Sequence, residues 1–132
     1  MTILLWKILG AGTKGPITGE AGNLGYQEIC LKIKNEGWTA VEDSNGPYAY
    51  GSGNQWVGYD TIKSVTAKAE YVKSKGLGGA MFWDLATDDF NVSIHPHLGT
   101  IKNQSFNCLF QNRCGNGKFP LITAVSNALN NC

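Results

Sequence analysis

The sequence has no excess of either charge and no long hydrophobic run. Its 132 residues include 11 Lys and Arg and 10 Asp and Glu, which gives a formal net charge of +1. Neither sign forms a block, so the chain lacks the basic surface that binding to nucleic acids or anionic membranes requires. No apolar stretch reaches the roughly 20 residues of a transmembrane helix. We therefore predict neither a nucleic acid nor a membrane as a partner.

The sequence also has no C-x-x-C pair, and this absence disfavours a zinc ribbon or a thioredoxin-like redox motif. An even number of cysteines is instead typical of disulfides formed in an oxidising compartment. Sequence spacing alone allows all three possible pairings of the four residues. The cysteines are Cys30, Cys108, Cys114 and Cys132.

Residues 86–118 show neither a helical nor a strand period, which is typical of a functional loop or an insertion rather than of a compact core. The loop contains two N-x-S sequons, at Asn91 and Asn103, that favour a secreted glycoprotein, although sequons this short also occur by chance. It also contains His95 and His97, which could supply half of a metal site. The cysteine spacings fit no zinc pattern, and two exposed loop histidines are the simpler interpretation, so we predict no metal and no cofactor.

The amino-terminal residues 2–9 are apolar except for Lys7. They fit a cleavable secretory signal poorly, because no basic residue precedes them and Lys7 interrupts them. Since the rest of the sequence has the features of a secreted protein, we expect that the chain does not begin where the natural protein begins.

The first half of the chain predicts one helix followed by three antiparallel strands. Residues 23–36 place apolar side chains on one helical face, with Asn23 as a cap for the start and Gly37 for the end. Aromatic residues then alternate with turn sequences, a pattern typical of short strands on a half-buried sheet. The three strands are expected at residues 38–41, 48–50 and 55–59.

The second half predicts a helix, a strand and a second helix of the parallel α/β type. Asp60 is a good N-cap for a helix over residues 60–75. A short apolar strand is expected at residues 80–85, and Pro120 favours a helix over residues 119–130. One strand cannot form a parallel sheet. We therefore expect this half to be a piece of a larger sheet whose other strands are not in this chain.

Several motifs follow one another in a fixed order and spacing, over about residues 9–129 without the loop 91–113. In this order they resemble the carboxyl-terminal third of animal family-18 chitinases and chitinase-like lectins. The motifs are Glu20-Ala21-Gly22, Gly25-Tyr26-Gln27-Glu28-Ile29-Cys30, Gly46-Pro47-Tyr48-Ala49-Tyr50, Asn54-Gln55-Trp56-Val57-Gly58-Tyr59-Asp60, Lys75-Gly76-Leu77-Gly78-Gly79-Ala80-Met81-Phe82-Trp83, Asp88-Asp89-Phe90 and Cys114-Gly115-Asn116-Gly117-Lys118-Phe119-Pro120-Leu121-Ile122.

The resemblance implies a fold of mixed α+β and α/β class, namely part of a TIM (β/α)8 barrel that carries an α+β insertion domain. Residues 1–59 would form most of the insertion domain. Residues 60–132 would form the carboxyl-terminal piece of the barrel, its last helix, strand and helix, with an extra loop at 91–113. This division agrees with the change from aromatic antiparallel strands to parallel α/β pattern near residue 60.

The resemblance also implies the residues that would contact a sugar. Trp83 would be the aromatic floor under a pyranose, whose apolar face of C–H groups a rigid indole covers at little entropic cost. Without the resemblance, a buried core tryptophan would be the favoured interpretation. Glu20 matches a family carboxylate that contacts sugar hydroxyls, with a solvated surface glutamate as the alternative. Cys30 would pair with Cys114, which leaves Cys108 to pair with Cys132.

The family hydrolyses chitin, a chain of β-1,4-linked N-acetylglucosamine, with the substrate's acetamide oxygen as nucleophile and a Glu in a D-x-x-D-x-D-x-E motif as acid. This motif is absent from the chain, because none of its five Glu has an Asp two residues before it. We therefore predict a fragment of a secreted chitinase that contributes a sugar-binding groove but is inactive alone. The alternatives are a non-catalytic chitin-binding or chitinase-like lectin and a small disulfide-tied interaction domain.

Overall fold

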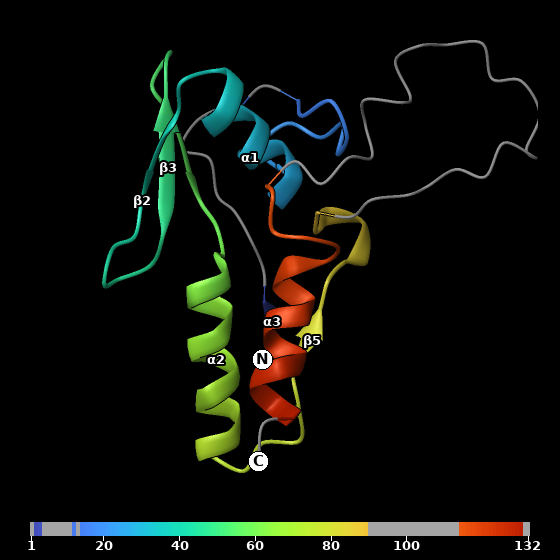
Figure 1. Cartoon of the computed structure of the whole chain (residues 1–132). Coiled ribbons are helices and arrows are strands. Elements are labelled where there is room, and N and C mark those ends of the chain that lie inside the picture. Colours follow the sequence, from blue (N-terminus) through green and yellow to red (C-terminus); the bar gives the residue numbers. More distant parts are fainter. Residues whose placement is uncertain (1, 4–11, 13, 90–113, 131–132) are drawn as a thin grey trace, which may run out of the picture.

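One end of the molecule holds a three-stranded sheet and one helix (Figure 1). The other end holds a pair of helices and a short parallel sheet. A computed structural model describes residues 2–3, 12, 14–89 and 114–130. The elements are β1 (Thr2–Ile3), α1 (Tyr26–Asn35), β2 (Thr39–Val41), β3 (Tyr48–Gly51), β4 (Gln55–Gly58), α2 (Ile62–Ser74), β5 (Met81–Phe82), the 3₁₀ helix η1 (Leu85–Thr87) and α3 (Pro120–Asn130). The expectations for Asn91, His95, His97, Asn103, Cys108 and Cys132 lie outside the described residues.

The three antiparallel strands predicted from the aromatic pattern are confirmed, in the order β2-β3-β4. In their register Ala49 lies opposite Val57, and both side chains are fully buried. Ile29 of α1 is fully buried in the same core cluster. Since side chains alternate along a strand, Tyr50 and its partner Trp56 lie on the opposite, outer face of the sheet. Burial of the inner face against α1 therefore fixes which aromatics face outward.

Helix α1 begins two residues later than Asn23 would place it, so the prediction that Asn23 caps it was wrong. Gly25 is the N-cap, and its N–H donates to the carboxylate of Glu28, 2.6 Å away. The Asn23 amide instead donates to Glu20 Oε2 at 2.7 Å. The predicted end is confirmed, since Gly37 follows the helix with a φ of 69°, a left-handed conformation that glycine adopts without strain.

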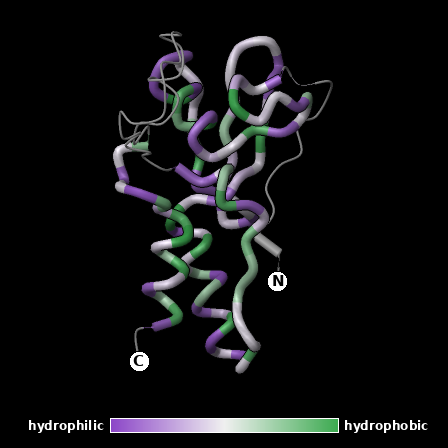
Figure 2. Tube along the Cα trace, turned by 90° about the vertical axis from the view of Figure 1, so that its right-hand side faces the viewer, coloured by the Kyte–Doolittle hydropathy of each residue, from purple (hydrophilic) through white to green (hydrophobic). Residues whose placement is uncertain are grey.

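Helices α2 and α3 lie side by side (Figure 1) and pack through small and branched apolar residues. Val65, Ala69 and Val72 of α2 and Leu121 and Val125 of α3 are all buried. Hydrophobic positions recur along both helices in Figure 2, as a buried face at helical spacing requires. Pro120 occupies the first turn of α3, as predicted.

The cap of α2 is Thr61 and not the predicted Asp60. Thr61 accepts a hydrogen bond from the Ser64 N–H at 3.2 Å. Asp60 is 4 % exposed and forms an ion pair with Lys68 Nζ at 2.6 Å, while the Ser64 hydroxyl donates to it. A buried carboxylate requires such partners, and they draw Asp60 away from the capping position.

The expectation of a lone parallel strand was wrong, because β1 supplies a neighbour. Thr2 pairs with Met81 and Ile3 with Phe82 in a parallel two-stranded sheet. Strand β5 is also shorter than predicted, since the chain turns at Asp84 into η1.

Among the described residues, no helix is long and apolar enough to cross a membrane.

Candidate functional site

Trp83 immediately follows β5 and is 68 % exposed. The interpretation of this residue as a buried core tryptophan is therefore wrong. It lines a cavity with Tyr26 and Asp88, but the volume of about 20 Å³ is too small for anything larger than a water molecule. A ligand would thus lie on the open surface of the indole ring rather than in an enclosed pocket.

The turn after Trp83 is held from two directions. Asp84 accepts a hydrogen bond from the Thr87 N–H at 3.0 Å, and the Thr87 hydroxyl donates to the Asp84 carbonyl at 2.9 Å. On the other side, the buried Gln27 amide donates to the Ala86 carbonyl at 3.1 Å. Both anchors limit the movement of η1, so the backbone beside Trp83 is positioned before any ligand arrives.

Glu20 lies exposed on the loop that leads into α1. Its carboxylate accepts one hydrogen bond from Asn23, which orients it without burying it. The amino-terminal end of α1 in turn adjoins η1, since a β carbon on Gly25 would lie 3.3 Å from the Thr87 carbonyl oxygen. The loop that carries Glu20 and the turn that follows Trp83 therefore meet at the start of α1.

This loop is held by Glu28, a role that the sequence patterns did not reveal. Glu28 is 1 % exposed, and its carboxylate accepts N–H groups from Ile17 at 2.7 Å, Thr18 at 3.1 Å and Gly25 at 2.6 Å. Gly15 completes the enclosure, because a β carbon there would overlap the same carboxylate. Three backbone donors compensate for burying the charge. The sequence signal that could have indicated this role is the spacing of Gly25 and Glu28, which is that of a capping box at a helix start.

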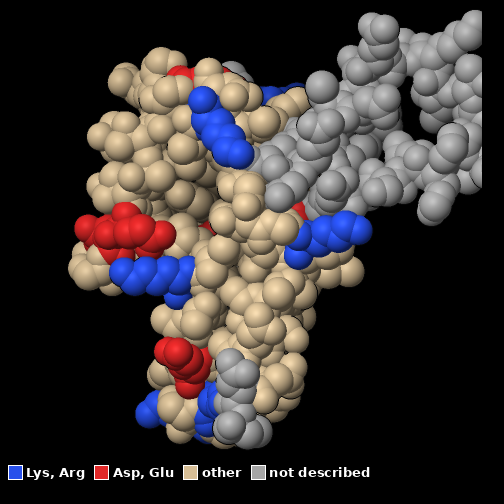
Figure 3. Space-filling model, viewed as in Figure 1, with Lys and Arg blue, Asp and Glu red and all other residues tan. Residues whose placement is uncertain are grey.

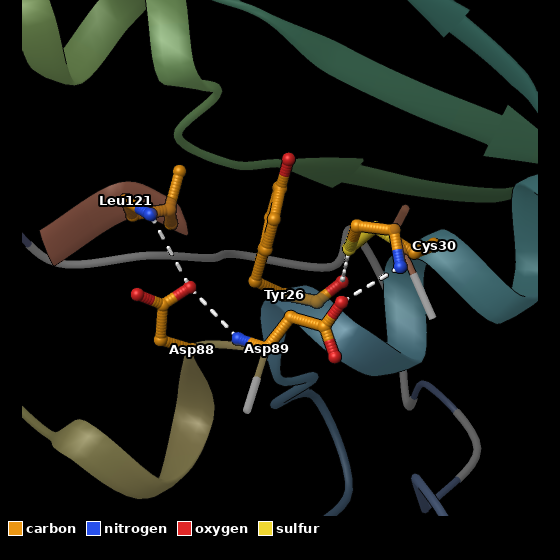
Figure 4. Close-up of a disulfide and its surroundings, with 6 residues drawn as sticks. Tyr26, Cys30, Asp88, Asp89 and Leu121 are labelled. Atoms are coloured by element: carbon orange, nitrogen blue, oxygen red, sulfur yellow. Dashed lines mark hydrogen bonds between the residues drawn. A yellow bond between two sulfur atoms is a disulfide. The ribbon is translucent and has the colours of Figure 1, made fainter. Parts of the chain in front are cut away.

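The predicted disulfide between Cys30 and Cys114 is confirmed, and it ties α1 to the segment before α3 (Figure 4). Asp89 lies beside it and accepts the Cys114 N–H at 2.7 Å. Asp88 accepts the N–H groups of Leu121 at 3.5 Å and Ile122 at 3.1 Å. These carboxylates thus hold the start of α3 against the turn after β5, and they act as helix and loop anchors.

Tyr26, Asp88 and Asp89 form a cluster beside the disulfide, and burial is the largest cause of the pKa shifts of Tyr26 and Asp88. It raises the pKa of Asp88, and hydrogen bonds from three backbone N–H groups offset part of that rise. Burial also raises the pKa of Tyr26 to about 12, so the phenol stays protonated across the physiological range. Asp88 is 4 % exposed and its acceptors are occupied by backbone, which leaves it no open face toward a ligand. The cluster supports the fold beneath Trp83, and it does not present a free general acid.

Within the described part of the chain, no group of three or more His, Cys, Asp or Glu side chains could hold a metal ion. What the surface offers is an exposed indole on a fixed turn and an oriented carboxylate on a neighbouring loop. An aromatic face and hydrogen-bonding oxygens are the groups that recognise a flat, hydroxylated ligand.

The chain is similar to known proteins over most of its length. Residues 4–88 match the family described as Glycosyl hydrolases family 18. Human Chitinase-3-like protein 2 is 40 % identical over 120 residues, which are 91 % of this chain and 26 % of that protein. The chain therefore spans about a quarter of the length of this curated relative.

Solved structures give the same result. The catalytic domain 2 of the Ostrinia furnacalis Group II chitinase, a mutant in complex with penta-N-acetylchitooctaose, superposes with a TM-score of 0.74 at 30 % identity, over 99 % of this chain and 33 % of that one. Human YKL-39, described as a pseudo-chitinase with retained chitooligosaccharide binding properties, superposes with a TM-score of 0.68 at 36 % identity, over 92 % of this chain and 28 % of that one.

Proposed function

Because this chain belongs to glycosyl hydrolase family 18, we propose that it forms part of a binding groove for chitin, the β-1,4-linked polymer of N-acetylglucosamine. Two of the structures that it resembles are of proteins described with chitooligosaccharides. The chain would contribute sugar contacts through Trp83 and Glu20. It would act outside the cell, a placement that the Cys30–Cys114 disulfide supports.

We also propose that the chain is a partial barrel. Helix α2, strand β5 and helix α3 would be the last helix, strand and helix of a (β/α)8 barrel, and residues up to 59 most of an α+β insertion domain. The parallel β1–β5 pair and the buried faces of α2 and α3 support the barrel part of this assignment, and the pairing would place Thr2 and Ile3 with the barrel rather than with the insertion domain. Trp83 would then stand at the carboxyl end of a barrel strand, where active sites of such barrels lie.

The observation that carries the proposed function is the exposure of Trp83 on a fixed turn. Trp83 is 68 % exposed, so a large apolar surface stays in contact with water at a cost in free energy. A tryptophan without a binding role would tend to be buried instead. A pyranose stacked on Trp83 recovers that burial. The oriented carboxylate of Glu20 would accept hydrogen bonds from sugar hydroxyls near the same end of α1.

Replacing Trp83 with alanine is expected to weaken binding of a chitin tetramer by at least tenfold. The loss of the aromatic platform at the centre of a contact is typically worth ~2 kcal/mol. Isothermal titration calorimetry on the full chain measures the change. Tyr71→Ala is the matched control, because Tyr71 is 54 % exposed on α2 and lies outside the turn after β5. Equal affinities of the Trp83→Ala variant and the unaltered chain would refute the proposed role.

No hydrolysis of chitooligosaccharides by this chain alone is expected, because it contains no D-x-x-D-x-D-x-E motif. Protonation of the leaving oxygen contributes about 10² to 10⁴ in rate, and Asp84, Asp88 and Asp89 are all engaged with backbone N–H groups. Release of a fluorescent aglycone from a chitotrioside measures the activity. Turnover that exceeds a no-protein blank, survives repurification and falls in the Trp83→Ala variant would contradict this expectation.

A non-catalytic chitinase-like lectin is the second candidate, favoured by the 36 % identity to a pseudo-chitinase with retained chitooligosaccharide binding properties. The chitinase fragment and the lectin would share the sugar-binding groove, and they would differ only in whether the whole protein carries the catalytic Glu of the D-x-x-D-x-D-x-E motif. A disulfide-tied interaction domain without sugar binding is the third. No binding of the unaltered chain to chitin beads would favour that third candidate over the other two.

A further inference from the structure

A second concave site lies between the turn that joins β2 and β3, strand β4 and the first half of α2. Its volume is about 830 Å³, which is within the usual range for small-ligand sites. It shares no lining residue with the small cavity beside Trp83. The two sites are thus separate, and neither the disulfide cluster nor the turn after β5 contributes to this one.

Trp56 forms an aromatic wall of this cavity. Its ring lies over Gly58, since a β carbon there would be 3.2 Å from the indole Cη2. Tyr48 supports it from the side, with ring centroids 5.7 Å apart and planes inclined by 31°. The indole is therefore seated on the sheet by neighbours on the same strand pair, and it remains partly exposed toward the cavity. A flat, fixed ring beside open space is a stacking platform.

The remaining walls are polar, with charges of both signs. Glu42 and Asp43 come from the β2–β3 turn, and Lys63 from α2. Figure 3 shows acidic and basic side chains directly beside each other where this turn approaches α2. The Asp60–Lys68 ion pair, at 2.6 Å, occupies the inner end. The cavity is thus lined by three carboxylates and two lysines, whose charges nearly balance, so it favours a neutral ligand with many hydroxyl groups over a strongly charged one.

We propose that this cavity is a second, non-catalytic sugar site that binds a neutral pyranose oligosaccharide. One pyranose stacks on Trp56, and its hydroxyls bond to Glu42, Asp43 and Lys63. The ligand class is shared with the proposed function, but the site does not rest on Trp83. Its purpose would be to add a second point of attachment to a polymeric chain, which raises the effective affinity without new chemistry.

A titration of the ¹⁵N-labelled full chain with a chitin tetramer tests the proposal. Two independent sites are expected, with the indole N–H signals of Trp56 and Trp83 both shifting. Trp56→Ala should weaken binding of the tetramer at the second site at least tenfold. It should leave the shift of the Trp83 signal unchanged. Tyr50→Ala is the matched control, since Tyr50 is 46 % exposed on the same sheet face but does not line the cavity.

A second variant keeps the test valid if Trp56→Ala disturbs the sheet. Ala67 lines the cavity from the exposed side of α2, so Ala67→Arg fills the space without altering the core. It should abolish the Trp56 shift alone. A Trp56 signal that stays fixed at saturating tetramer, or shifts equally in Ala67→Arg, overturns the second site. A fixed Trp83 signal instead overturns the proposed function and leaves the second site standing.

Discussion

The double variant Cys30→Ala, Cys114→Ala is expected to lose about 4 kcal/mol of unfolding free energy. The bridge joins residues 84 positions apart, and closing so long a loop restricts the unfolded chain by roughly that amount. Between the two cysteines lie the sheet, α2 and β5, so their arrangement depends on this single described cross-link. Asp89 bonds to the Cys114 N–H, which couples the bridge to the turn after β5. Urea denaturation followed by circular dichroism measures the loss.

The single variants provide the control. Either Cys30→Ala or Cys114→Ala opens the same loop, so each alone should cost nearly as much as the pair, and the two losses should not add. If each single variant lost little unfolding free energy and the two losses summed to that of the double variant, the cysteines would act through local packing and not through the bridge. A double variant within about 1 kcal/mol of the unaltered chain would contradict the loop-closure argument.

The elements with strong periodicity could be predicted from the sequence, whereas their exact boundaries could not. The buried faces of α2 and α3 follow from apolar spacing, and the three-stranded sheet follows from aromatic alternation between turns. Both N-caps were displaced, from Asn23 to Gly25 and from Asp60 to Thr61. In each case the expected residue bonds instead to another side chain nearby in the sequence, Asn23 to Glu20 and Asp60 to Lys68.

Non-local pairing explains the remaining misses. Strands β1 and β5 are two residues each, too short to show any period, so their parallel pairing could not be read from the sequence. The position of Trp83 as a candidate contact was available from its place after an apolar strand and from family resemblance. Composition alone would not have predicted its exposure, because a large apolar side chain favours burial. The buried role of Glu28 depends on donors up to 11 residues away, on a loop without regular structure.

Replacing Glu28 with alanine is expected to lower the unfolding free energy by about 4 kcal/mol, because three backbone donors lose a charged acceptor at once. Glu28→Gln should cost about half as much. Its single remaining oxygen can still accept from Ile17 and Thr18, whereas its NH₂ group cannot accept from Gly25. The loop that carries Glu20 would loosen in both variants. Hydrogen exchange of the Ile17, Thr18 and Gly25 amides measures this directly, beside urea denaturation for the global loss.

Glu36→Gln separates this specific role from a general loss of negative charge on α1. Glu36 follows the same helix and pairs with Lys32 at 3.1 Å, but its side chain is 54 % exposed, so its removal should cost less than about 0.5 kcal/mol. The three loop amides should keep their protection in that variant. Because the loop and η1 meet at the start of α1, the Glu28 variants should also weaken oligosaccharide binding at Trp83, while the site at Trp56 stays intact. Equal protection of the three amides in Glu28→Gln and Glu36→Gln would show that the loop is held by other contacts, and Glu20 would then lose its proposed positioning by Glu28.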